Sequence, residues 1–135
     1  IKWLDGMSFV AETGSGHLLA MDGAPEAGGR NLAPRPMELM LAGAGGCTAF
    51  DVVLILKRGR HDIRCCSVRL EAERADTHPK VFTRVRFIYT LSGRKLKRDA
   101  VERAIHLSAE KYCSASIMLG KTAEISHEFE IVEAD

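Results

Sequence analysis

The most prominent hydrophobic pattern is an almost unbroken apolar run from Leu39 to Leu56, in which only Thr48 and Asp51 are clearly polar. The range 36–58 opens on a proline, which is well tolerated as a first helical residue because its missing N–H has no partner there. The pattern therefore predicts one long helix over this range. A helix that is apolar on nearly every face must be covered on all sides.

Two kinds of environment can cover such a helix. A membrane span is one, but Asp51 is costly in lipid and Gly43, Gly45 and Gly46 weaken the helix there. We favour the core helix of a protein. Because a sheet covers only one side, we expect the same helix of a second copy to cover the rest, which predicts a homodimer.

The regions beside this helix alternate with the period of strands. Residues 3–12 and 17–21 predict two strands around the turn 13–16, and a Gly/Pro-rich stretch, 22–36, leads into the helix. Beyond it, residues 63–74 and 80–91 predict a hairpin. Their expected inner faces comprise Cys66, Val68, Leu70 and Ala72 on one strand, and Val81, Val85, Phe87, Tyr89 and Leu91 on the other.

The last third of the chain predicts two helices and a strand. Residues 95–112 form an amphipathic pattern with Val101, Ala104, Ile105, Ser108 and Tyr112 on the inner side. A short helix over 114–119 and a strand over 123–132 follow, and the strand has Ile125, His127, Phe129 and Ile131 inward. This order predicts the α+β class and one domain over 1–135.

Composition narrows the function classes. The chain has 135 residues, 46% hydrophobic and 27% charged, with a formal charge of +1, so we expect neither nucleic acid nor a membrane as partner. The first residues have no signal-like apolar segment. The four cysteines are sparse and irregular, unlike a disulfide framework. Both features predict a cytoplasmic protein.

Two of the cysteines could carry chemistry. Cys47 lies inside the apolar helix, where a thiol is either a small core residue or a functional group, and Asp51 on the same face argues against a thiolate. Cys113 precedes the short helix, whose first N–H groups favour a thiolate. The alternative is again a packed thiol.

The remaining candidate ligands form no site. Cys65 and Cys66 are adjacent on a strand, so we expect Cys65 at the surface and Cys66 in the core. The five histidines show no metal-binding spacing, and we interpret His127 as a hydrogen-bonded core residue. We therefore expect no metal site.

The segments around Cys47 and Cys113 resemble the two cysteine motifs of the OsmC/Ohr family. They read PMELMLAGAGGCTA over 36–49 and EKYCSASI over 110–117. The chain is most similar to the YhfA-like branch, which shares the short stretches found here as Ser15 to His17, Leu107 to Cys113 and Ile125 to His127.

The resemblance implies an OsmC-like fold, an intertwined homodimer with two central helices wrapped by antiparallel β-sheets. It also implies a thiol-dependent organic hydroperoxide reductase, in which Cys47 is the peroxidatic thiolate and Cys113 resolves it as a disulfide. The partners implied are a small hydroperoxide and an external dithiol reductant such as lipoamide. No metal, haem or flavin cofactor is implied.

The chain departs from the family pattern in its activating residues. Arg30 and Arg35 are the only arginines before Cys47, and both lie in the Gly/Pro-rich stretch. Glu38 is the candidate for the family's catalytic glutamate, although a spacing of nine residues places it opposite Cys47 on a straight helix. Two other functions therefore stay open: a non-catalytic protein that binds a small hydrophobic ligand in the dimer groove, and a structural dimer with buried thiols.

Overall fold

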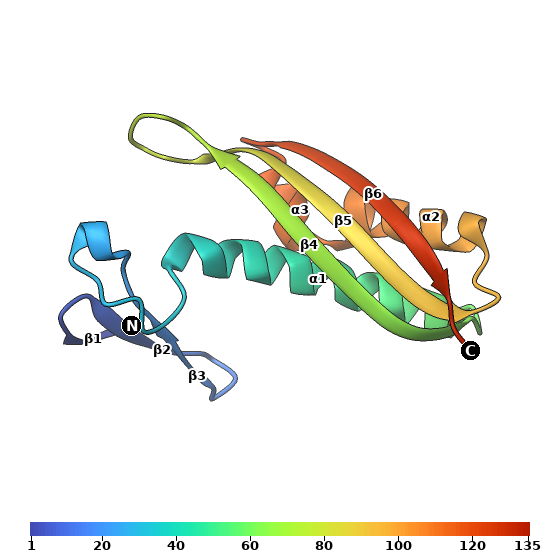
Figure 1. The fold of residues 1–135 in the computed structure, drawn as a ribbon, viewed down its shortest axis with the longest axis horizontal. Helices are drawn as coiled ribbons and strands as arrows, with labels where there is room; N and C mark the ends of the chain where they lie inside the picture. Colours follow the sequence, from blue (N-terminus) through green and yellow to red (C-terminus); the bar gives the residue numbers. More distant parts are fainter. The chain divides into compact units, whose positions relative to one another are not determined.

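The computed structural model describes residues 1–135, which divide into two compact units over 1–42 and 43–135. Helix α1 (Pro36–Arg58) begins in the first unit and continues through the second (Figure 1). Its bounds confirm the predicted helix.

The first unit is built on a three-stranded antiparallel sheet. Its strands are β1 (Lys2–Asp5), β2 (Ser8–Glu12) and β3 (Leu18–Met21), in the order β1-β2-β3. The single strand predicted over 3–12 is wrong, because Gly6, with a φ of 57°, reverses the chain between β1 and β2. The predicted turn over 13–16 is confirmed by the hydrogen bond from Thr13 N–H to the carbonyl of His17.

A buried carboxylate orders the Gly/Pro-rich stretch that follows, which also contains a short 3₁₀ helix, η1 (Pro25–Ala27). Asp22 accepts the N–H groups of Gly23 at 2.7 Å and Leu32 at 3.2 Å. Burial alone would raise the pKa of Asp22, but these backbone donors outweigh it and the pKa is lowered. The stretch is therefore a fixed loop rather than a plain linker.

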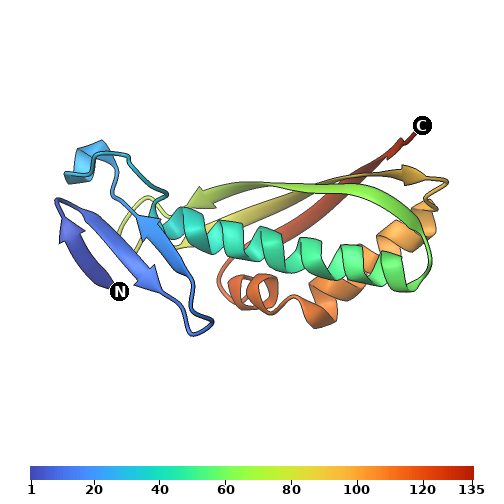
Figure 2. The same ribbon diagram turned by 90° about the horizontal axis from the view of Figure 1, so that it is seen from below.

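The second unit is a three-stranded sheet with helices on one face (Figure 2). The sheet order is β4-β5-β6, with β4 and β5 antiparallel and β5 and β6 parallel. The expectation of purely antiparallel sheets is wrong here, because a helical crossover separates the last two strands. The elements are β4 (Asp62–Arg74), β5 (Phe82–Arg94), α2 (Arg98–Leu107), η2 (Ser108–Tyr112), α3 (Ser114–Leu119) and β6 (Glu124–Glu133).

The core of this unit lies between the sheet and the helices. The predicted inner face of β5 is confirmed from Val85 onward, since Val85, Phe87, Tyr89 and Leu91 are fully buried. Val81 lies outside the strand and is 40% exposed, because an irregularity near Arg74 shifts the pairing.

The amphipathic helix differs from its prediction at both ends. It begins at Arg98 and changes at Ser108 into the π-helical turn η2. This wider turn rotates the following residues, so Tyr112, predicted on the inner face, is 50% exposed. The short helix and the last strand are confirmed within one residue.

Helix α1 packs on the sheet along one face only. Its buried residues after Gly43 are Ala44, Gly45, Thr48, Val52 and Leu56. A Cβ on Gly45 would lie 2.7 Å from Cδ1 of Leu70, so the glycine allows α1 to approach β4 closely. The other face is open, and Phe50 is 68% exposed. By length and composition, α1 is also the one helix that could cross a membrane.

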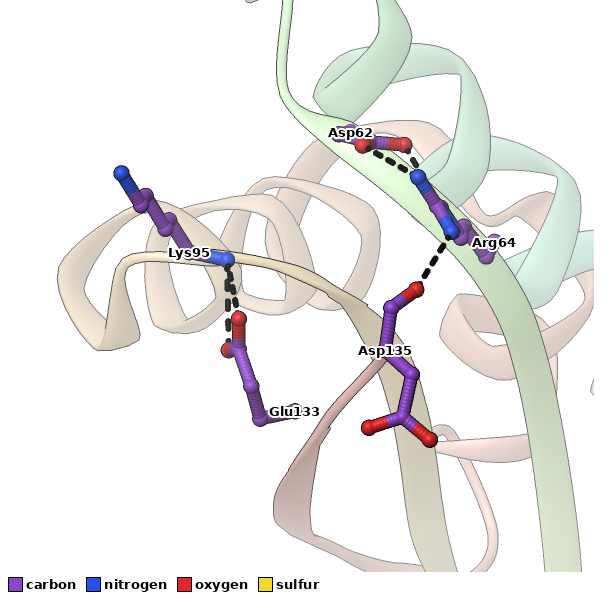
Figure 3. A network of polar contacts seen from close by, with 5 residues as sticks. All are labelled: Asp62, Arg64, Lys95, Glu133 and Asp135. Atoms are coloured by element: carbon purple, nitrogen blue, oxygen red, sulfur yellow. Dashed lines mark hydrogen bonds and ion pairs between the residues drawn. The ribbon is translucent and has the colours of Figure 1, made fainter.

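A group of polar contacts fixes the C-terminal end of the sheet (Figure 3). Arg64 on β4 is hydrogen-bonded to Asp62 and to the carbonyl of Asp135 at 3.1 Å. The carboxylate of Glu133 accepts the backbone N–H of Lys95, which follows β5 with a φ of 55°. These contacts tie Glu133 at the end of β6 to the residue after β5, and Asp135 to β4.

Candidate functional site

The buried thiol of Cys113 lies at the start of α3. Cys113 is the N-cap of that helix, and its sulfur accepts the N–H of Ser116 at 3.4 Å. The side chain is fully buried. Its S–H points to the carbonyl of Ala44 on α1 at 3.9 Å, so the thiol lies against that helix. The prediction that a new helix begins at Cys113 is confirmed.

The structure brings the second predicted cysteine to the same place. Cys47 follows Ala44 by less than one turn of α1, so its thiol lies near that of Cys113, and this neighbour raises the pKa of Cys113. Cys47 is half-buried, whereas Cys113 is fully buried. The pair therefore consists of one thiol that reagents can reach and one that they cannot.

The environment of Cys113 favours its protonated form. Burial raises the pKa of Cys113, the Ser116 hydrogen bonds oppose this, and the nearby Cys47 thiol raises it again. The balance is a raised pKa. A protonated, buried thiol is a poor first nucleophile but can react with an activated sulfur beside it.

A chain of buried hydroxyl groups lies next to the two thiols. The hydroxyl of Thr48 is 2.8 Å from that of Tyr89 and 2.8 Å from that of Ser108, and Ser108 donates to a carboxylate oxygen of Asp51 at 2.9 Å. Thr48, Tyr89 and Ser108 are fully buried. Burial raises the pKa of Tyr89 to about 12, although its bond to Thr48 lowers it.

His127 continues this chain on β6. Its Nδ1 is 3.2 Å from the Tyr89 hydroxyl, and its ring stacks on that of Phe87 with centroids 5.1 Å apart. The prediction of a hydrogen-bonded, inward histidine is confirmed. His127 also lines two small cavities that share Ala109 and Glu110 on η2, of about 320 and 210 Å³.

The other predicted site residues lie in the first unit. Glu38 accepts the backbone N–H of Arg35 at 2.9 Å, which satisfies a free donor at the start of α1. Arg30 forms an exposed ion pair with Asp5 at 3.4 Å. Both contacts are local to that unit, and neither arginine is part of the thiol pair described above.

Of the remaining cysteines, Cys65 lies at the surface as predicted, whereas Cys66, predicted in the core, is only partly buried. Cys65 is exposed and Cys66 is half-buried on β4, where burial, and to a lesser extent Cys65, raises the pKa of Cys66. The chain contains no cluster of three or more His, Cys, Asp and Glu side chains that could hold a metal ion.

Comparisons with known proteins identify the family. The sequence model of the OsmC family, described as OsmC-like protein, matches residues 28–128. Protein YhfA of Escherichia coli strain K12 is 47% identical over 134 residues, covering 99% of this chain and 97% of that protein.

Solved structures agree with this result. A hypothetical protein from Aquifex aeolicus VF5 has a TM-score of 0.76 at 25% identity, over 98% of this chain and 100% of that one. An organic hydroperoxide resistance protein OsmC from Legionella pneumophila has a TM-score of 0.66 at 16% identity, over 96% and 99% of the two chains. This chain therefore belongs to the OsmC-like protein family.

Proposed function

We propose that this protein is a thiol-dependent reductase of organic hydroperoxides, with Cys47 as peroxidatic and Cys113 as resolving cysteine. The observation that carries the proposal is that the fully buried thiol at the start of α3 lies against the turn of α1 that bears Cys47, a half-buried thiol. Family membership supports it, as does the name of the hydroperoxide resistance protein that shares the fold.

In the proposed reaction the Cys47 thiolate attacks the outer oxygen of the peroxide. The O–O bond breaks, the leaving oxygen takes up a proton and departs as an alcohol, and Cys47 becomes a sulfenic acid. The Cys113 thiol then attacks the sulfenic sulfur and releases water, which leaves a disulfide. The substrate is oxidised at neither step: the peroxide gains the two electrons that the thiol pair loses.

A dithiol such as dihydrolipoamide restores the thiols in the proposed cycle. It attacks the sulfur of Cys47, because that sulfur is the accessible one. Cys113 leaves as a thiolate, which the N–H of Ser116 is placed to stabilise, and Cys47 is held in a mixed disulfide with the reductant. The second thiol of the reductant then attacks its own sulfur in that mixed disulfide, which releases Cys47 and leaves the reductant as a cyclic disulfide. The cycle needs no metal, haem or flavin, and a reducing cytoplasm would maintain it.

We also propose that two copies pair through the open face of α1. Gly43, Gly46, Cys47, Phe50 and Leu54 share this face by helical spacing. A Cβ on Gly43 or Gly46 would meet nothing within 4 Å, so another chain can approach closely there. Because Cys47 lies on the same face, a second copy would form one wall of the proposed site.

Peroxide consumption with and without each thiol tests the function. With cumene hydroperoxide and dihydrolipoamide, we expect Cys47→Ser to reduce turnover to the rate without protein. Without dihydrolipoamide, Cys113→Ser should reduce about one equivalent of peroxide and stop as a sulfenic acid, whereas the wild type should stop as a disulfide. Cys65→Ser, which removes an exposed thiol outside the pair, is the control and should keep the wild-type rate.

Equal turnover by Cys47→Ser and the wild type would refute the proposal. A freshly purified protein that retains a small hydrophobic ligand in native mass spectrometry and turns over no peroxide would instead support the binding function.

A further inference from the structure

Ser108 is bonded to the segments of both cysteines through different atoms. Its carbonyl accepts the N–H of Cys113 at 2.8 Å. Its hydroxyl lies 2.8 Å from that of Thr48, the residue that directly follows Cys47. Ser108 is fully buried, so each bond is shielded from water. One residue thus connects the backbone of one cysteine with the neighbour of the other.

The π-helical turn η2 makes the first of these bonds possible. The bond from Cys113 to Ser108 spans five residues, one more than in an α-helix. In a regular α-helical turn the N–H of Cys113 would bond to Ala109, and every later residue would be rotated by about 100°. The wider turn therefore sets the direction in which Cys113 leaves the helix.

Counting hydrogens gives the hydroxyl chain a single direction. Ser108 has one hydroxyl hydrogen and gives it to Asp51, so it must accept from Thr48. Thr48 has then used its own hydrogen and must accept from Tyr89. Tyr89 in turn accepts from Nδ1 of His127. The chain runs from His127 to the carboxylate of Asp51.

This direction determines the state of His127. The histidine must carry its proton on Nδ1, which leaves Nε2 as the free acceptor. The hydrogen bonds require a proton on Nδ1, and the lowered pKa favours the neutral ring: burial lowers the pKa of His127, and Glu110 only partly opposes this. Every hydroxyl between β6 and α1 is therefore committed to one orientation.

We propose that Ser108, Thr48 and Tyr89 are positioning residues for the cysteine pair. The one-way chain holds Ser108 between α1 and η2, and Ser108 holds the two cysteine segments together. None of the three hydroxyls takes part in the thiol chemistry itself. This inference rests on the proposed function, because it assumes that Cys47 and Cys113 react with each other. How well the two thiols are held together can nevertheless be measured without peroxide.

The test is the effective concentration of the two thiols, measured as the equilibrium between the reduced protein and its Cys47–Cys113 disulfide in glutathione buffers. Thr48→Val keeps the shape but removes the hydroxyl, and we expect it to lower the effective concentration by about tenfold or more, since small misplacements of reacting groups have effects of this size. Thr48→Ser keeps the hydroxyl and should stay within about threefold of the wild type.

A second measurement reports on the chain of hydrogen-bonded hydroxyls itself. ¹⁵N NMR of His127 should show the Nδ1–H tautomer in the wild type and a mixture of tautomers in Tyr89→Phe. Thr90→Val is the matched control, because it removes a hydroxyl of the same strand that bonds Glu130 away from the thiols. Thr90→Val should change neither the effective concentration of the two thiols nor the tautomer of His127.

An unchanged effective concentration in Thr48→Val, or an Nε2–H tautomer in the wild type, would overturn the positioning role. A wild-type protein that reduces no peroxide, yet loses effective concentration in Thr48→Val, would refute the proposed function alone.

Discussion

At the scale of single residues, the sequence identified the two thiols but not the hydroxyls beside them. The motifs singled out Cys47 and Cys113, and the hydrophobic pattern marked Thr48 and Ser108 only as polar residues at inward positions. A polar side chain in a core needs a partner, which is a usable signal. Here the partners of Thr48 lie 41 and 60 residues away, and only the packed fold brings them together.

His127 carries a prediction at this scale. Because burial lowers its pKa below the ordinary value of 6.5, the unfolded chain binds more protons than the folded one as the pH falls through this range. The contribution of His127 to stability is present above pH 6.5 and is lost as the pH falls through its folded pKa. Denaturant unfolding from pH 7 to 5 should show a falling free energy of unfolding.

His127→Asn is the matched variant, because its amide can still donate to Tyr89 but does not titrate. We expect the free energy of unfolding of the variant to depend less steeply on pH than that of the wild type. The difference in slope should correspond to less than one proton taken up on unfolding. Parallel curves for the two proteins between pH 7 and 5 would show that His127 is not the group responsible.

At the scale of elements, the hydrophobic pattern of the sequence located the helices and strands. It did not predict the irregular helical turn or which strands are parallel. The apolar run and its proline gave the full extent of α1, since both signals are local. The π-helical turn η2 and the parallel pairing of β5 with β6 had no local signal. Alternation shows which side of a strand is buried, whereas strand neighbours depend on how the chain returns after the helices.

The start of α1 offers a test that separates two roles of Glu38. Its carboxylate accepts the N–H of Arg35, and the family resemblance proposes a part for it in the reaction. Glu38→Ala removes both the acceptor for the Arg35 N–H and the carboxylate for the reaction. It should lower the free energy of unfolding by about 0.5–2 kcal/mol. Glu38→Gln keeps an acceptor oxygen, so we expect wild-type stability with reduced peroxide turnover. Wild-type turnover in Glu38→Gln would assign Glu38 to helix capping alone.

At the scale of the whole molecule, a single chain leaves the apolar helix half covered. The sequence predicted that α1 must be covered on all sides, and within one chain only the face toward the sheet is. The polar residues of α1 are bonded inward, with Asp51 held by Ser108 and Thr48 by Tyr89. This arrangement is typical of a helix packed within protein, which favours a second copy over lipid as the missing cover.

Phe50 tests that pairing, because it is the large apolar side chain at the middle of the open face and is 68% exposed. A two-fold interface would contain it twice, and burying a phenylalanine contributes about 1.5–3 kcal/mol per copy. Sedimentation velocity should therefore give a dimer for the wild type and a monomer for Phe50→Glu at micromolar concentration, with lower peroxide turnover in the variant. Val132→Glu places the same charge at an exposed apolar residue of β6 and should remain dimeric. A monomeric wild type with full turnover would show that one chain builds the whole site.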